Sequence, residues 1–138
     1  YAEQTSGIST SAKFEVDQGV LVASVYTVPE GIATAPEAAT LTEIAGNAAV
    51  SPFQAKVEVF EDKAHIARAA SHLTLMQLSK LSLKEVIRKA IRSRGGTPID
   101  VRNPTVRDGR AVADVVMLDS YLEPFTVTVD LIRGSVVR

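Results

Sequence analysis

The alternation of apolar and polar residues predicts a hairpin near the start of the chain. Residues 13–16 and 21–28 are rich in apolar side chains, and Asp17-Gln18-Gly19 between them is a short polar turn that ends in glycine. In the second segment apolar residues occupy both sets of alternate positions, which indicates a strand that is buried over much of both faces. The pattern therefore predicts two antiparallel strands before residue 29.

Residues 29–52 are rich in Ala, Thr, Pro and Gly and form a long connection, and long connections often contain a short element. Thr34 and Glu37 have the spacing of a capping box, and Gly46-Asn47 is a plausible helix end, so we expect a short helix at about 37–45. Residues 56–60 then alternate between apolar and polar side chains, which predicts a third strand.

Two helices follow this strand. Apolar residues recur at helical spacing over 63–77 after Asp62, a candidate N-cap. Residues 82–85, Ser-Leu-Lys-Glu, form a capping box before a second apolar stripe over 83–94, and Gly95-Gly96 supplies a C-terminal stop.

Three strands are expected after the glycine pair, over residues 99–106, 111–118 and 125–131. The Asp108-Gly109 pair between the first two is a strong hairpin signal. Residues 106–115 also repeat the pattern of residues 16–25 at a constant offset of ninety positions, which suggests an internal duplication.

These elements predict an α+β fold in the order βββα–αβββ. We expect one continuous antiparallel sheet or two small ones, with both helices packed on one face. The predicted halves are residues 1–80 and residues 81–138. A three-stranded sheet with one helix buries only a thin core, so the halves are expected to pack together.

Composition narrows the class of protein without indicating an activity. The chain has 138 residues, 46% of them hydrophobic, which suits one compact domain or two very small ones. It has no cysteine, which excludes disulfides and cysteine-ligated metals, and no apolar run of the ~20 residues that span a bilayer. Because the chain begins with Tyr1 and not with Met, it is either a processed product or a trimmed piece of a longer chain; in the first case we expect a signal peptide to have been removed.

Charge is unevenly distributed along the chain. Residues 1–62 carry nine acidic and two basic side chains, net −7, whereas residues 63–138 carry thirteen basic and seven acidic ones, net +6. Such asymmetry can mark a nucleic-acid-binding half, or two halves that neutralise one another within a chain or a dimer. The overall balance favours the second interpretation, so we expect no nucleic-acid partner.

No arrangement of residues in the sequence predicts catalysis. His65 and His72 lie seven positions apart on the predicted helix, ~10 Å along its axis, so one metal ion does not reach both. The chain lacks the G-x-S-x-G nucleophile elbow and the glycine-rich phosphate-binding motifs. Two pairs of acidic residues are candidates for acid–base chemistry: the adjacent Glu61 and Asp62, and Asp119 with Glu123 four positions later. We therefore expect no catalytic residue, cofactor or metal site.

A basic face on the second helix is the most conspicuous surface feature. It consists of Lys84, Arg88, Lys89 and Arg92. Since no aromatic residue accompanies them, docking of an acidic protein surface is favoured over nucleic acid. The open edges of an antiparallel sheet are the other expected binding feature, because a partner strand can pair with them.

Residues 81–137 resemble a PepSY domain. The resemblance is carried by LSLKEVIRKAIRSRGG at 81–96, the Asp-Gly turn at 108–109, and FTVTVDLIRGSVV at 125–137. Val129-Asp130 and Gly134 stand where that family places them, whereas Arg133 stands in place of its usual Thr. The family's frequent Tyr on the middle strand is also absent.

The resemblance implies a helix followed by three antiparallel strands, and it extends weakly to residues 1–80. The chain would then consist of two PepSY-like, cystatin-like halves. It also implies a periplasmic or secreted protein that restrains a peptidase or binds another envelope protein through its sheet, without insertion into the membrane. The alternative is a self-assembling, dimeric structural subunit with no regulatory partner.

Overall fold

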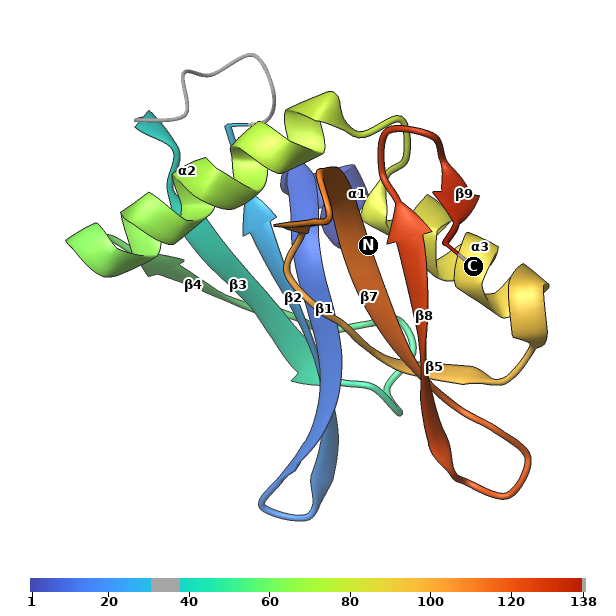
Figure 1. Ribbon diagram of the computed structural model, residues 1–138. Helices are drawn as coiled ribbons and strands as arrows, with labels where there is room; N and C mark the ends of the chain where they lie inside the picture. Colours follow the sequence, from blue (N-terminus) through green and yellow to red (C-terminus); the bar gives the residue numbers. More distant parts are fainter. Residues whose placement is uncertain (31–37, 138) are drawn as a thin grey trace.

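The computed structural model describes residues 1–30 and 38–137, which form one large antiparallel sheet with three helices (Figure 1). The strand order is β4-β3-β2-β1-β5-β7-β8-β9, and β6 also pairs with β7. In chain order the elements are α1 (Ala2–Thr5), β1 (Ile8–Asp17), β2 (Val20–Val28), β3 (Leu41–Asn47), β4 (Lys56–Phe60), α2 (Lys63–Leu78), α3 (Leu83–Arg94), β5 (Thr97–Val101), β6 (Thr105–Arg107), β7 (Arg110–Leu118), β8 (Pro124–Asp130) and β9 (Ser135–Val136).

Elements with strong local signals occur where the sequence predicts them. The capping box of α3 forms, because Ser82 Oγ accepts from the Glu85 N–H at 3.3 Å and the Glu85 carboxylate accepts from the Ser82 N–H at 2.7 Å. At α2 the carboxylate of Asp62 accepts from the His65 N–H at 3.1 Å. Strand β4 and helix α3 have the predicted bounds.

The short helix expected at 37–45 is wrong over the described residues. Residues 41–47 instead form β3, which pairs with β2 on one side and β4 on the other. Hydrogen bonding to two strands outweighs the weak local preference for helix. Gly46 lies within β3 and so does not end a helix. Glycine is required there because a Cβ would lie 2.5 Å from the Gln54 carbonyl oxygen. The expected capping box at 34–37 lies outside the described residues.

The strand expected at 99–106 is interrupted after Val101. Strands β5 and β6 both pair with β7, and residues 102–104 between them leave the ladder. Proline has no N–H to donate, so Pro104 is unsuited to a continuous central strand.

The two hairpins of the duplicated pattern have the same geometry. Their central residues have positive φ, at 48° and 78° for Gln18 and Gly19 and at 51° and 72° for Asp108 and Gly109. Two adjacent residues with positive φ are typical of the type I′ turn, whose twist matches that of the strands. The strands that follow, β2 (20–28) and β7 (110–118), begin and end ninety positions apart.

The two halves of the sheet are built outward from its centre in the same order. Strands β1 and β5 are paired at the centre through Ala12 with Val101 and Lys13 with Asp100. From there β2, β3 and β4 follow on one side and β7, β8 and β9 on the other. The α2 helix is preceded by four strands rather than the expected three, because β3 replaces the predicted helix.

Helices α2 and α3 pack on opposite faces of the sheet, so the expectation that both cover one face is wrong (Figure 1). Directly paired residues share a face. An apolar row on one face crosses the sheet from β4 to β8 through Val57, Ile44, Val25, Ala12, Val101, Val115 and Val127. This face, called the α3 face here, buries Leu83, Val86 and Ala90 of α3.

The opposite face, called the α2 face, carries Val28 and Leu41 against Ala69 and Leu73 of α2. Residues 79–82 connect the helices around the end of the sheet, where the Lys80 N–H donates to the Leu131 carbonyl at 2.8 Å. The apolar stripe on each helix specifies burial, whereas the path of this connection decides which face is covered.

Candidate functional site

The basic residues predicted for docking lie on the outer side of α3. Lys84, Arg88 and Arg92 are exposed and Lys89 is half-buried. Among residues 1–30 and 38–137, none forms an ion pair with these four side chains. Their charge therefore remains available to an acidic partner.

The two histidines of α2 have different surroundings. His65 is held by the Asp62 carboxylate at its Nδ1 and stacks on Phe60, with ring centroids 4.3 Å apart. His72 is half-buried, and its Nδ1 is buried without a hydrogen-bond partner. Burial, and then the charge of Arg68, hold the pKa of His72 below its ordinary value.

In each acidic pair that the sequence offers for acid–base chemistry, the aspartate accepts hydrogen bonds from nearby backbone N–H groups. Asp62 caps α2, and hydrogen bonds from the His65 N–H and then its ring lower the pKa of Asp62. Asp119 accepts from the N–H groups of Tyr121 and Glu123 at 2.8 and 2.9 Å and so stabilises the turn between β7 and β8. Over the described part of the chain, no group of three or more His, Asp or Glu side chains could hold a metal ion.

A cleft of about 490 Å³ lies between α2 and the centre of the sheet, where β1 meets β5. This α2 cleft was not anticipated, because its walls come from segments that are far apart in the sequence. Its charged and titratable lining consists of Lys13, Tyr26, His65, Arg68, His72, Asp100 and Arg102. Three of these residues are permanent cations and one is an acid.

The cations of the α2 cleft are partnered to different degrees. Lys13 Nζ lies 3.4 Å from a Glu15 carboxylate oxygen, and Arg102 Nε lies 3.9 Å from an Asp100 carboxylate oxygen. Exposed ion pairs of this kind contribute little to stability and exchange readily with other partners. The guanidinium of Arg68 has no ion pair or hydrogen bond to any described residue.

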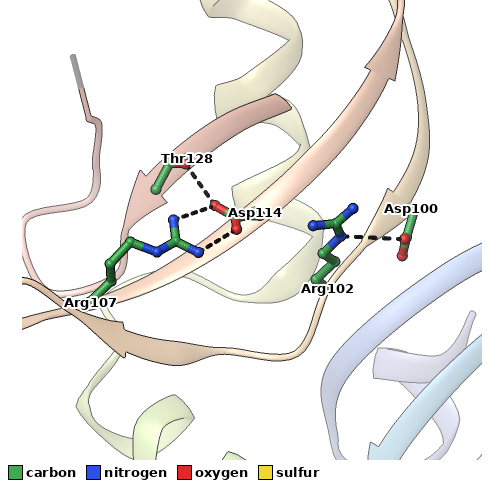
Figure 2. Close-up of polar contacts among 5 residues, drawn as sticks. All are labelled: Asp100, Arg102, Arg107, Asp114 and Thr128. Carbon is green, nitrogen blue, oxygen red and sulfur yellow. Dashed lines mark hydrogen bonds and ion pairs between the residues drawn. The ribbon is translucent and has the colours of Figure 1, made fainter. Parts of the chain in front are cut away.

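Beside the cleft, Asp114 holds three strands together (Figure 2). Its carboxylate accepts two hydrogen bonds from the Arg107 guanidinium, at 3.2 and 2.7 Å, and one from Thr128 Oγ1 at 2.7 Å. These bonds join β6, β7 and β8. The bond from Arg107 is the largest cause that lowers the pKa of Asp114, which is almost fully buried.

Strand β4 ends the sheet on the side of the first half. It pairs only with β3, and its Val57 and Val59 side chains are 63% and 52% exposed on the α3 face. It is longer than β6 and β9, the other described strands that pair on one side only. Strand β4 is therefore the most extended open edge in the described part of the chain.

Comparisons with known proteins assign no family to this chain. No family model and no curated protein matches it. A crystal structure of a "putative lipoprotein" from Clostridium difficile 630 superposes with a TM-score of 0.45 at 13% identity, over 95% of this chain and 80% of that one. This similarity is too low to transfer any property between the two proteins. No helix formed by the described residues is long and apolar enough to cross a membrane.

Proposed function

We propose that this protein is a non-enzymatic, extracytoplasmic binding module of the PepSY type, which takes up a strand of a partner protein along β4. The partner in this proposal is a peptidase or another protein of the envelope or the secreted fraction. The observation that carries the proposal is the exposure of β4, a five-residue edge strand with two exposed valines.

Strand addition fits the chemistry of β4. The backbone N–H and C=O groups that point away from β3 have no partner in the described chain, so an extended peptide can bind them. The exposed Val57 and Val59 alternate with Lys56 and Glu58 and offer apolar contacts on one face. Monomeric proteins commonly protect such edges with proline, bulges, charged side chains or a covering segment. Strand β4 has no proline and no bulge, and its charged residues Lys56 and Glu58 lie on the face opposite the exposed valines.

The assignment to the PepSY type rests on residues 81–137 and is supported by their order of elements. A capped helix is followed by antiparallel strands, and Val129-Asp130 ends β8. The common strand order of the two halves further supports two PepSY-like units. In this proposal α1 corresponds to α3, since both lie on the α3 face and the Lys84 N–H donates to the Glu3 carboxylate at 3.2 Å. Helix α2 then connects the units.

Two neighbouring proline variants test the role of β4. Along an edge strand, successive N–H groups point alternately toward the paired strand and away from it. Of Val57→Pro and Glu58→Pro, one therefore removes a bond to β3 and the other removes only an outward N–H. The purified variants are first compared by urea unfolding to find the one that keeps the stability of the sheet.

The stable variant is then used beside the wild type as bait for the extracytoplasmic fraction of the source cells. We expect one protein to be recovered with the wild type and lost with the stable proline variant. Peptidase activity of the recovered fraction is measured with and without added chain, and a decrease supports restraint of a peptidase. Equal recovery by the wild type and the stable proline variant would contradict strand addition at β4. A further bait with Lys84, Arg88 and Arg92 changed to Glu then tests docking on α3.

Self-assembly is the second candidate function, and it is favoured by the self-complementary sequence of β4. If two copies pair antiparallel about Val57, Lys56 of each lies opposite Glu58 of the other, and the two valines face each other. The molar mass of the purified chain, measured by light scattering, should then be that of a dimer. Lys56→Glu should dissociate it, and Lys56→Glu combined with Glu58→Lys should restore it.

A further inference from the structure

The α2 cleft combines a confined volume with cationic side chains that have few partners. It lies on the α2 face, whereas the exposed valines of β4 lie on the α3 face, so its role is separate from strand addition. Arg68 and His72 are four residues apart on α2 and therefore lie on the same side of the helix. Both line the cleft, and neither the Arg68 guanidinium nor the His72 Nδ1 has a hydrogen-bond partner in the described chain.

A buried ring nitrogen without a partner is unusual in a folded protein. Buried polar atoms are nearly always hydrogen-bonded, to protein, water or a ligand. Because the His72 Nδ1 has almost no accessible surface, a ligand in the cleft meets the accessible part of the imidazole, and it must also accept a hydrogen bond from the Arg68 guanidinium. An oxyanion satisfies both requirements, since arginine binds carboxylate and phosphate oxygens with two parallel hydrogen bonds.

The charged groups that line the cleft also favour a negatively charged ligand. The titratable and charged groups that line it, besides His72, are Arg68 and His65 from α2, Lys13 from β1, Tyr26 from β2, Asp100 from β5 and Arg102 after it. Burial, and then the neighbouring carboxylate of Glu43, raise the pKa of Tyr26 to about 12, so this group remains neutral. Lys13 and Arg102 each have one acidic neighbour, which leaves Arg68 as the unpaired cation.

We infer that the α2 cleft is a binding site for a small oxyanion, a carboxylate or a phosphate group, held by Arg68 and His72 with Lys13 and Arg102 beside it. The bound group would place a negative charge next to the imidazole of His72. That charge favours the protonated ring and strengthens the hydrogen bond from it. Binding is therefore coupled to protonation of His72 and is tighter at lower pH.

The two histidines make this coupling directly measurable. Each imidazole gives one Cε1–H signal by NMR, so the chain has two such signals; because His65 also lines the cleft, the reference for His72 is the same signal in the Arg68→Gln variant. The titration is performed in chloride, in inorganic phosphate and in succinate at equal ionic strength. We expect phosphate or succinate to raise the pKa of His72 by about one unit relative to chloride. The arm with the larger shift distinguishes a phosphate ligand from a carboxylate ligand.

Two substitutions separate binding in the cleft from general screening of charge. In Arg68→Gln the pKa of His72 should rise in chloride, because a neighbouring cation is removed, and neither anion should raise it further. Arg110→Gln, a matched change of an exposed arginine at the β6–β7 turn, should leave the response of the wild type intact. The inference is overturned if neither anion raises the pKa of His72 relative to chloride, or if the rise persists in Arg68→Gln.

Discussion

The two halves of the sheet share their strand order but differ in how much core they bury. In the second half, α3 has twelve residues and contributes three of them to a cluster of twelve buried residues, which also includes Met76 of α2 and Val115, Val129 and Leu131. In the first half the helix at the corresponding place is α1, with four residues, and the separate cluster of five buried residues among those described lies on the α2 face under α2. The larger cluster is therefore covered by a full-length helix on the α3 face, where the first half has only α1.

The same difference appears at the hairpin tips. The β1–β2 hairpin projects beyond the body of the sheet (Figure 1) and exposes Phe14, Val16 and Leu21 on the α3 face. In the second half, ninety positions further along, Pro104 and Ala111 are buried and only Val106 is exposed. The same strand order is thus compatible with one half that buries the apolar residues of its hairpin and one half that leaves them exposed to solvent.

The largest expected effect compares the two cores with the same substitution. Leu131→Ala and Leu73→Ala each truncate a leucine that is fully buried, one in the larger cluster and one in the smaller. We expect a loss of free energy of unfolding of about 4 kcal/mol for Leu131→Ala and about 2.5 kcal/mol for Leu73→Ala, since a small cluster relaxes more easily around a cavity. Urea unfolding measures both. A larger loss for Leu73→Ala would contradict the comparison.

The second prediction concerns corresponding buried positions of β2 and β7. Asp114 accepts three hydrogen bonds, whereas the hydroxyl of Ser24, ninety positions earlier, is buried without a partner in the described chain. Asp114→Asn should lower the free energy of unfolding by about 2 kcal/mol, through loss of charge-assisted bonds. Ser24→Ala should be nearly neutral or stabilising, since it removes an unsatisfied group. A comparable loss for both variants would show that Ser24 has a partner in solution.

The third prediction follows from the lowered pKa of Asp114. A carboxyl group whose pKa is lower in the folded state than in the unfolded chain contributes stability above the unfolded value, which is about 3.9. That contribution is lost as the pH falls through the lower, folded value. The difference in unfolding free energy between wild type and Asp114→Asn should therefore be constant above about pH 5 and decrease toward pH 2. A difference that stays constant throughout this range would exclude the ion pair as its source.

The smallest expected effect concerns the two type I′ turns, where the halves should behave alike. Gly19 and Gly109 have positive φ, and a Cβ built at either position meets no atom within 4 Å. Gly19→Ala and Gly109→Ala should therefore each lower the free energy of unfolding by about 1 kcal/mol, from backbone strain alone. A much greater loss at one turn would mean that its hairpin has contacts that the other lacks.

Local sequence determined the elements whose signals lie within a few residues. The Ser82–Glu85 capping box specified α3, and Gln-Gly and Asp-Gly at corresponding positions specified two equivalent hairpins. The alternation over 56–60 specified β4. In α3 and the hairpin turns the stabilising bonds connect residues close in sequence, whereas β4 is bonded to β3 and its alternation alone indicated a strand.

Tertiary structure decided the features that depend on distant partners. Residues 41–47 are a strand because they pair with β2 on one side and β4 on the other. The sequence signals for the start and end of a helix near these residues did not prevent that pairing. The faces covered by α2 and α3 follow from the path of residues 79–82 around the end of the sheet. The α2 cleft combines β1, α2 and β5, and the proximity of Lys13, Arg68 and Arg102 has no counterpart in their spacing along the chain. Amphipathic patterns specify how much surface is buried, whereas only the assembled sheet determines which surfaces meet.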